Sequence, residues 1–350
     1  MSSTLQPSAA GNLDLRPGHP PILGVGAGGD PVGWAAHHRN DVRQIVARYG
    51  SVLVRGLGVR DHAQTAAVFS RLAAVGLLPE REAFAPRTPL GDGLYSATPW
   101  PANQQMCLHH ELSYLPDPPA FVFFACLTPP AAGGATPVGD ASAVLQSLPP
   151  GLVTRFEREG WLLERTYNEE IGSPWAEAFA TDDPRAVEQY CRSHAIDFSW
   201  TPEGGLKTHQ RRPAVARHPV TGVRCWFNQV AFLNEHTLDP EVREFLVESY
   251  GPDSLPFTTR FGDGTPVGPD VVALINTVYE RHLVRESWQP GDVLLVDNIR
   301  TAHGREPYTG TRSVLVGMAD PVHIGQIAPA PGTVPGPRTP GAQSAPMTAS

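Results

Sequence analysis

Three residues of the sequence, His109, Glu111 and His303, could together bind a divalent transition metal. His109 and Glu111 lie two positions apart in the segment 108–114, and in extended backbone the side chains at i and i+2 point to the same face. His110 then points to the opposite face. An imidazole and a carboxylate are two members of the 2-His-1-carboxylate triad that holds Fe(II) and leaves coordination positions open. Alone, this short motif also fits a histidine pair in the core or at the surface.

A distal histidine supplies the third ligand. The segment 291–298 has the pattern of a turn followed by an apolar strand, and His303 comes shortly after it, next to a glycine. A histidine just beyond a buried strand can point into the mouth of a barrel, where glycine permits close approach of the backbone. The alternative is a loop histidine that caps the strand. Taken together, the two segments predict one metal site.

A site of this kind that uses 2-oxoglutarate needs an anchor for the far carboxylate, because the 2-oxo acid end chelates the iron. Arg312 opens the last predicted strand, and a guanidinium suits bidentate binding of a carboxylate. Thr136 follows a tight turn at Gly133-Gly134 and offers a hydroxyl to the same carboxylate. Arg305 is a competing candidate, and Arg312 would also fit as an ordinary surface arginine.

The elements that must position these residues are a mixture of strands and helices. Strands are predicted at 51–57, 106–111, 120–127, 224–232, 292–297 and 312–318, and helices at 41–49, 62–77, 152–159, 184–194, 240–250 and 269–283. Strands near both ends thus enclose a mixed, helix-containing segment at about 149–268. This order predicts a β-sandwich or jelly roll that carries a lid insertion, and disfavours a doubly wound sheet.

Both ends of the chain have compositions that favour little structure. Residues 1–20 are polar with proline and glycine, and predict a flexible N-terminus. Residues 323–350 consist mostly of Pro, Ala, Gly, Thr and Ser, and predict a disordered tail. Between them, residues 21–322 are expected to form a single domain.

The bulk properties exclude several classes of protein. The chain has 350 residues and a formal net charge of −8, without a basic cluster, so nucleic-acid binding is disfavoured. The four cysteines are widely spaced, which argues against a disulfide framework or a structural zinc site and predicts a reducing, cytoplasmic location. No apolar stretch approaches the roughly 20 residues that span a bilayer.

Matching segments along most of the chain resemble the TauD/TfdA superfamily of Fe(II)/2-oxoglutarate oxygenases, and within it the clavaminate synthase-like, SyrP-like branch. The resemblance covers roughly residues 20–322, in segments that occur in a specific order. They are Val52–Gly56, His109–Tyr114, Phe124–Cys126, Gly133–Thr136, Asp140, Trp226–Gln229, Phe261–Gly264, Trp288–Asp292, Asp297–Asn298, His303–Arg305 and Arg312. Two positions depart from the branch: His110 replaces the usual Asn, and Ala135 replaces the usual Glu.

The resemblance implies a mainly β protein with α-helices, built on a double-stranded β-helix (jelly-roll) core with a lid insertion. It implies that His109, Glu111 and His303 bind Fe(II), and that Thr136 and Arg312 bind the co-substrate 2-oxoglutarate. With O2 as the second co-substrate, the implied activity is hydroxylation of an unactivated C–H bond, with release of succinate and CO2. The implied substrate is an amino acid or an amino-acid-derived natural-product intermediate, either free or tethered to a peptidyl carrier protein.

Related halogenases lack the carboxylate ligand, so that chloride can take its place, and Glu111 therefore favours hydroxylation. Desaturation and cyclisation remain open, because they depend on how the substrate is placed. The candidate substrate-binding residues are Ser113, Tyr114, Asn228, Gln229 and Arg305. Tyr114 fits equally well as a core aromatic.

Two other functional classes compete with this hypothesis. A non-catalytic jelly-roll binding or regulatory protein would be expected to lack one of the ligands or the anchor arginine, and all are present here. A zinc hydrolase could use the same three ligands, but has no reason to retain Arg312 together with Thr136.

Overall fold

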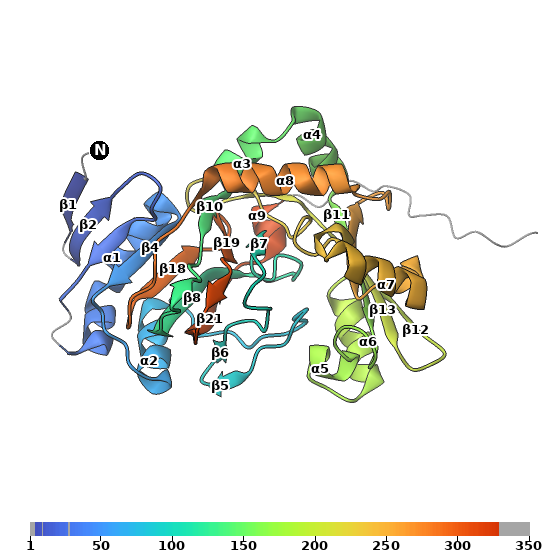
Figure 1. The fold of residues 1–350 in the computed structure, drawn as a ribbon, viewed down its shortest axis with the longest axis horizontal. Coiled ribbons are helices and arrows are strands. Elements are labelled where there is room, and N and C mark those ends of the chain that lie inside the picture. Colours follow the sequence, from blue (N-terminus) through green and yellow to red (C-terminus); the bar gives the residue numbers. More distant parts are fainter. Residues whose placement is uncertain (1–3, 9, 27–28, 329–350) are drawn as a thin grey trace, which may run out of the picture.

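The computed structural model describes residues 4–8, 10–26 and 29–328, and its centre is a pair of β-sheets (Figure 1). The larger sheet has the strand order β1-β2-β3-β4-β18-β8-β21-β6-β5. Its strands are β1 (Thr4–Ser8), β2 (Gly11–Leu15), β3 (Ile22–Gly24), β4 (Ser51–Arg55), β5 (Pro89–Gly91), β6 (Leu94–Ser96), β8 (Pro119–Thr128), β18 (Val293–Asp297) and β21 (Ser313–Pro321). Its central strands come from distant parts of the sequence, so this sheet requires both ends of the domain.

The smaller sheet carries two of the three predicted metal ligands. Its order is β17-β10-β19-β7, with β7 (Met106–His109), β10 (Val138–Asp140), β17 (Leu283–Val284) and β19 (Thr301–Arg305). The two sheets meet in an apolar cluster, in which Val138 of the smaller sheet joins Phe124, Leu294 and Val316 of the larger one. Two sheets packed face to face over such a cluster confirm the predicted jelly-roll core.

Two helices cover the outer face of the larger sheet: α1 (Pro31–Tyr49) and α2 (His62–Leu72) (Figure 1). Asp30 and Asp61 are their N-caps, and each carboxylate accepts a backbone N–H of the first turn at 2.8 Å. The buried face of both helices packs on the sheet in one apolar cluster, which includes Val46, Phe69 and Phe123. The helices thereby leave the inner face of the sheet free for the smaller sheet and the site.

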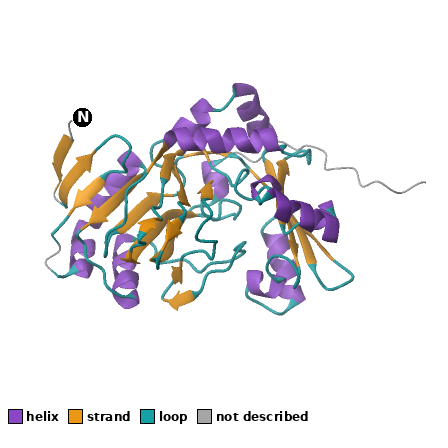
Figure 2. Ribbon diagram, in the orientation of Figure 1, coloured by secondary structure: helices purple, strands orange, loops and turns teal. Residues whose placement is uncertain are grey.

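Residues 149–268 contain a separate sheet of order β12-β13-β11-β16, which stands beside the core sheets (Figure 2). Its elements and those around it are α4 (Pro150–Glu159), β11 (Trp161–Tyr167), α5 (Trp175–Phe179), α6 (Pro184–Ser193), β12 (Ile196–Trp200), β13 (Leu206–Arg212), β14 (Val215–Arg217), β15 (Arg224–Trp226), η1 (Glu235–Thr237), α7 (Pro240–Tyr250), η2 (Pro252–Ser254) and β16 (Phe257–Phe261). We call residues 149–268 the inserted segment. Strands and helices mix in it as predicted, and its role as a lid stays a prediction.

One apolar cluster joins the inserted segment to the core. Helices α3 (Ala141–Ser147), α4 and α8 (Pro269–His282) lie along one side of the molecule (Figure 1). Their buried residues, among them Phe156 and Ile275, share this cluster with Leu108 of β7 and Trp161 of β11. The core and the inserted segment therefore bury their apolar surfaces together.

Glu82 makes a second, polar connection between the two parts. Its side chain is fully buried, and the carboxylate accepts hydrogen bonds from the Tyr190 hydroxyl, at 2.6 Å, and from the Gln210 amide. Its backbone carbonyl accepts from the Tyr114 hydroxyl and from the Arg165 guanidinium, which also donates to the next carbonyl at 2.9 Å. Tyr190, Gln210 and Arg165 all belong to the inserted segment.

The two ends of the chain differ from expectation. The predicted flexible N-terminus over residues 1–20 contains strands β1 and β2, because the alternation around Leu13 gives β2 one apolar face, and Leu13 is buried. At the start of the predicted disordered tail, α9 (Ile324–Ile327) buries Ile327, and residues 329–350 lie outside the described residues. Within the described ranges, no helix is both long and apolar enough to cross a membrane.

Candidate metal centre and co-substrate pocket

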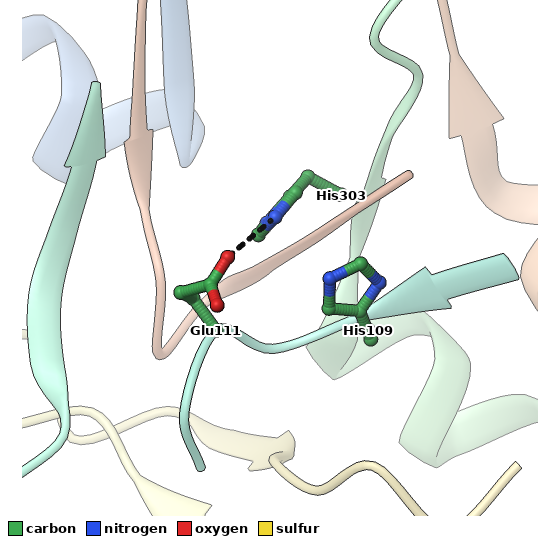
Figure 3. A group of neighbouring side chains, drawn as sticks. All are labelled: His109, Glu111 and His303. Carbon is green, nitrogen blue, oxygen red and sulfur yellow. Dashed lines mark ion pairs between the residues drawn. The ribbon is translucent and has the colours of Figure 1, made fainter. Parts of the chain in front are cut away.

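The structure brings His109, Glu111 and His303 together (Figure 3). His109 ends β7, Glu111 follows two residues later, and His303 lies in the middle of β19, where it is the register partner of His109. The three side chains offer ligand atoms that all lie within 4.8 Å of one another, and all three residues are buried. The predicted triad is thus assembled in space, with two ligands fixed by the pairing of two strands.

Hydrogen bonds orient the two histidines differently. Nδ1 of His109 donates to the carbonyl of Cys107 at 2.9 Å, which leaves the lone pair of Nε2 for a metal. The ring of His109 stacks on Phe232, with centroids 4.1 Å apart. His303 has its Nε2 3.4 Å from Oε2 of Glu111, while its Nδ1 has no hydrogen-bond partner within the described structure.

The backbone of Glu111 is held by the side chain of Asn298, directly after β18. Oδ1 of Asn298 accepts the N–H of Glu111 at 2.7 Å, and its Nδ2 donates to the Glu111 carbonyl at 2.8 Å. The side chain of His110 points away from the cluster, as the two-residue alternation predicted. Its Nδ1 lies 2.5 Å from the Asn298 carbonyl, and its ring packs edge-on against Phe227.

An arginine that the sequence did not single out also reaches the cluster. Arg87 donates from Nη2 to Oε2 of Glu111 at 2.9 Å, and both side chains are almost fully buried. Residue 87 lies in the irregular segment between α2 and β5, where no element was predicted. Only the tertiary structure brings this segment to β7, so no local pattern could have identified Arg87.

The pKa shifts of the cluster suit metal binding. Burial, with a further contribution from His303, lowers the pKa of His109 to about 3, so that its ring is neutral at pH 7. Burial would raise the pKa of Glu111, but Arg87, followed by His303, outweighs it and holds the pKa well below its usual range. Neutral imidazole and ionised carboxylate are the forms that coordinate a divalent cation. The donor set therefore fits Fe(II).

The predicted anchor for 2-oxoglutarate lies beside this cluster. Arg312 directly precedes β21 and donates from Nη2 to the Thr136 hydroxyl at 3.4 Å and from Nε to the Gly134 carbonyl at 3.0 Å. Thr136 follows the two-residue strand β9 (Ala132–Gly133), which pairs with β20 (Tyr308–Thr309). A Cβ on Gly134 would lie 2.9 Å from the Cβ of Tyr308, so glycine allows the close approach here.

A cavity connects the anchor with the metal ligands. Its walls are Arg87, Ala97, Thr98, Met106, His109, Phe124, Thr136, His303, Gly304, Arg305, Arg312, Val314 and Val316. Burial, with a smaller effect of Arg305, lowers the pKa of Arg312 to about 10. Among the described residues no carboxylate forms an ion pair with Arg312. A partly buried cation without an ion pair among the described residues, lining the same cavity as His109 and His303, fits a carboxylate ligand.

Of the five predicted substrate-binding residues, only Arg305 is among the described residues that line this cavity. Tyr114 donates its hydroxyl to the Glu82 carbonyl at 2.6 Å, and the Asn228 amide bonds the backbone of Ala214 at 2.9 Å and of Val230 at 3.0 Å. These contacts favour structural roles for Tyr114 and Asn228. The sequence did not show which backbone groups these two side chains bind.

The other three substrate candidates fall into two groups. Ser113 and Gln229 are buried, and the Oγ of Ser113 and Oε1 of Gln229 have no hydrogen-bond partner within the described structure. Arg305 lines the cavity, but its Nη atoms donate to the carbonyls of Trp100, Pro101 and Gln104 at 2.5–3.0 Å. Arg305 thus fixes the loop before β7, which disfavours it as the carboxylate anchor.

Comparison with known proteins gives consistent matches over most of the chain. The family model described as taurine catabolism dioxygenase TauD, TfdA family, matches residues 14–319. The dapdiamide synthesis protein DdaC of Enterobacter agglomerans is 33% identical over 288 residues, which cover 82% of this chain and 87% of that protein. A clavaminate synthase-like protein of Arabidopsis thaliana is 29% identical over 286 residues, covering 77% and 81% of the two chains.

Among solved structures, PvcB, described as an Fe, alpha-ketoglutarate dependent oxygenase from an isonitrile synthetic pathway, has a similar fold. The TM-score is 0.52 at 15% sequence identity, and the match covers 94% of this chain and 97% of that chain. At this identity, the likeness supports the fold.

Proposed function

The chain belongs to the TauD/TfdA family of Fe(II)/2-oxoglutarate-dependent oxygenases, and from this premise we propose that it hydroxylates an unactivated C–H bond of an amino acid or of an amino-acid-derived natural-product intermediate. The observation that carries the proposal is the buried group His109, Glu111 and His303, with Arg312 and Thr136 lining the cavity that His109 and His303 also line. In this proposal the first three bind Fe(II), and the last two bind the far carboxylate of 2-oxoglutarate.

Each residue has a definite task in this proposal. Bound iron, with 2-oxoglutarate and O2, supplies an oxidant that attacks an unactivated C–H bond, and succinate and CO2 are released. His109 and His303 would bind through ring nitrogens, and Glu111 would contribute the single negative charge of the donor set. The apolar walls of the cavity, Met106, Val314 and Val316, exclude water from the reacting centre.

Glu111 supports hydroxylation over halogenation, because its carboxylate takes the position that a halide would need. Desaturation and cyclisation use the same cofactors and remain alternative outcomes. The similarity to a protein of dapdiamide synthesis and to a clavaminate synthase-like protein supports a small natural-product substrate. The proposal includes a free amino acid and one held on a peptidyl carrier protein.

The test begins with the purified protein under anaerobic conditions. Addition of Fe(II) and 2-oxoglutarate should produce a weak visible charge-transfer band, and admission of O2 should then produce succinate. Candidate amino acids, free and as carrier thioesters, would next be screened by mass spectrometry for a gain of one oxygen. A folded protein that gave neither the band nor succinate would overturn the proposal, whereas a loss of two hydrogens would show desaturation or cyclisation instead.

A further inference from the structure

We propose that Arg87 is a positioning residue, which fixes the carboxylate plane of Glu111 so that it binds the metal through one oxygen only. This inference rests on the proposed function, because it assumes that Glu111 is a metal ligand. Arg87 is not one of the proposed metal ligands, and in the described structure it bonds neither Arg312 nor Thr136.

Arg87 is fixed on three sides. Its side chain is 7% exposed, and its Nη2 donates to Oε2 of Glu111 at 2.9 Å. Its Nη1 and its backbone N–H both donate to the carboxylate of Glu80, the latter at 3.0 Å, and its Nε donates to the Thr98 hydroxyl at 3.0 Å. Every nitrogen of the guanidinium therefore makes a hydrogen bond, which holds the plane of the group in one orientation.

This arrangement restricts how Glu111 can meet a metal. A carboxylate can bind a cation through one oxygen or through two. Two-oxygen binding would take one of the positions that a facial triad leaves open for co-substrate and oxygen. Arg87 bonds Oε2, the oxygen of Glu111 that also lies 3.4 Å from Nε2 of His303, and this charge-assisted bond hinders the rotation that would bring Oε1 to the metal as well. A neutral side chain at position 87 would permit that rotation.

Glu80 offsets the positive charge that Arg87 places next to Glu111. Arg87 alone would cancel the charge of Glu111 and weaken its attraction for a cation. Glu80 is bonded to the other side of the guanidinium, so the positive charge of Arg87 is shared between two carboxylates. Arg87 can therefore orient Glu111 without neutralising the site.

The test uses Co(II) as a visible probe of coordination in the full chain, together with 2-oxoglutarate binding. In Arg87→Met we expect the visible spectrum of bound Co(II) to differ from that of the wild type, because the Glu111 carboxylate can turn, and 2-oxoglutarate to bind about 10- to 100-fold more weakly, the range for loss of a partner that supports a ligand. Arg87→Lys keeps the charge but not the planar fork, so it should restore the affinity for 2-oxoglutarate more fully than the visible spectrum of bound Co(II).

A matched control separates this effect from general loss of stability. Arg55→Met also removes an arginine with two carboxylate partners, Asp292 and Glu286, but on the larger sheet. It should unfold more easily yet keep the wild-type Co(II) spectrum. An Arg87→Met protein with the wild-type spectrum and 2-oxoglutarate affinity would overturn this inference alone, as would an Arg55→Met spectrum altered to the same extent. Failure of the wild type to bind Fe(II) and 2-oxoglutarate would instead contradict the proposed function.

Discussion

His303 on β19 lies directly opposite His109 on β7 in an antiparallel pair, with ring centroids 4.6 Å apart, although the two residues are distant in sequence. Strand pairing thus fixes the separation of two candidate ligands before any metal binds. Glu111 lies just beyond the end of β7, where the Asn298 side chain holds its backbone. The group is therefore organised by the sheet and by one neighbouring loop.

Removal of either histidine ligand should abolish stable metal binding. In His109→Ala or His303→Ala, only one imidazole and one carboxylate remain, and the loss of affinity should exceed the 10- to 100-fold that is typical of a supporting residue. Isothermal titration with Mn(II) under anaerobic conditions would measure it. His209→Ala removes a histidine that is 43% exposed on β13 and should bind like the wild type. Metal affinity unchanged in both ligand variants would contradict the assignment.

Arg312→Ala should weaken 2-oxoglutarate without removing the metal. The charged anchor is expected to contribute about 2–3 kcal/mol, which corresponds to roughly a 30- to 150-fold higher Kd for 2-oxoglutarate. Titration of the charge-transfer band would give this Kd, and Mn(II) affinity in the absence of 2-oxoglutarate serves as the internal control. If the 2-oxoglutarate Kd stayed the same while the protein remained folded, the far carboxylate would have to bind elsewhere.

Asn298 should contribute to both stability and metal affinity. In Asn298→Ala the N–H and carbonyl of Glu111 lose a buried partner, and we expect the free energy of unfolding to fall by about 1–3 kcal/mol. Asn298→Asp keeps the acceptor but places a carboxylate against two backbone carbonyls, so it should be at least as unstable. Urea denaturation of the metal-free proteins would rank them, and an Asp variant as stable as the wild type would refute this role.

The buried cysteines should be unreactive in the native protein. Burial raises the pKa of Cys126 and Cys225 to about 12 and that of Cys191 to about 11, and it also raises the pKa of Cys107. Since the thiolate forms only as the pH approaches the pKa, the first three should carry roughly 100- to 1000-fold less thiolate at pH 8 than a thiol of pKa 9. Ellman's reagent should therefore modify them only after denaturation, and rapid reaction of the native protein would show that these sites open.

The sequence predicted what depends on local spacing. The two-residue alternation correctly separated His110 from the cluster, although the strand predicted at 106–111 ends at His109. His303 follows the apolar strand β18 as expected, but it lies in a strand of its own, β19, that was not predicted. The predicted jelly-roll fold and the family are confirmed, while the roles assigned to the site residues stay predictions. Arg87 and Glu82 were not foreseen, because both lie in an irregular segment, and their bonds to Glu111, Tyr190 and Gln210 join parts of the chain that only the fold brings together.

The residues predicted to bind substrate show that residue type alone does not reveal which group a polar side chain contacts. Tyr114 and Asn228 have the polar groups that a substrate site needs, but those groups bond backbone atoms that only the folded chain brings near. Residue type and order could not distinguish these two uses. The N-terminal strands were missed because the alternation in β2 is only five residues long, too short to outweigh the polar composition around it.

The buried hydrogen bonds at Glu82 also limit how often the inserted segment could separate from the core at this point. Separation of the inserted segment from the core there would break four bonds, donated by Tyr190, Gln210 and Arg165. At about 0.5–1.5 kcal/mol net for each bond, the opened form would lie about 2–6 kcal/mol higher and make up no more than roughly one molecule in thirty. A substrate that needed this form would lose apparent affinity by the same factor. We therefore expect the contact between Glu82 and the inserted segment to remain closed while substrates enter and leave by another route.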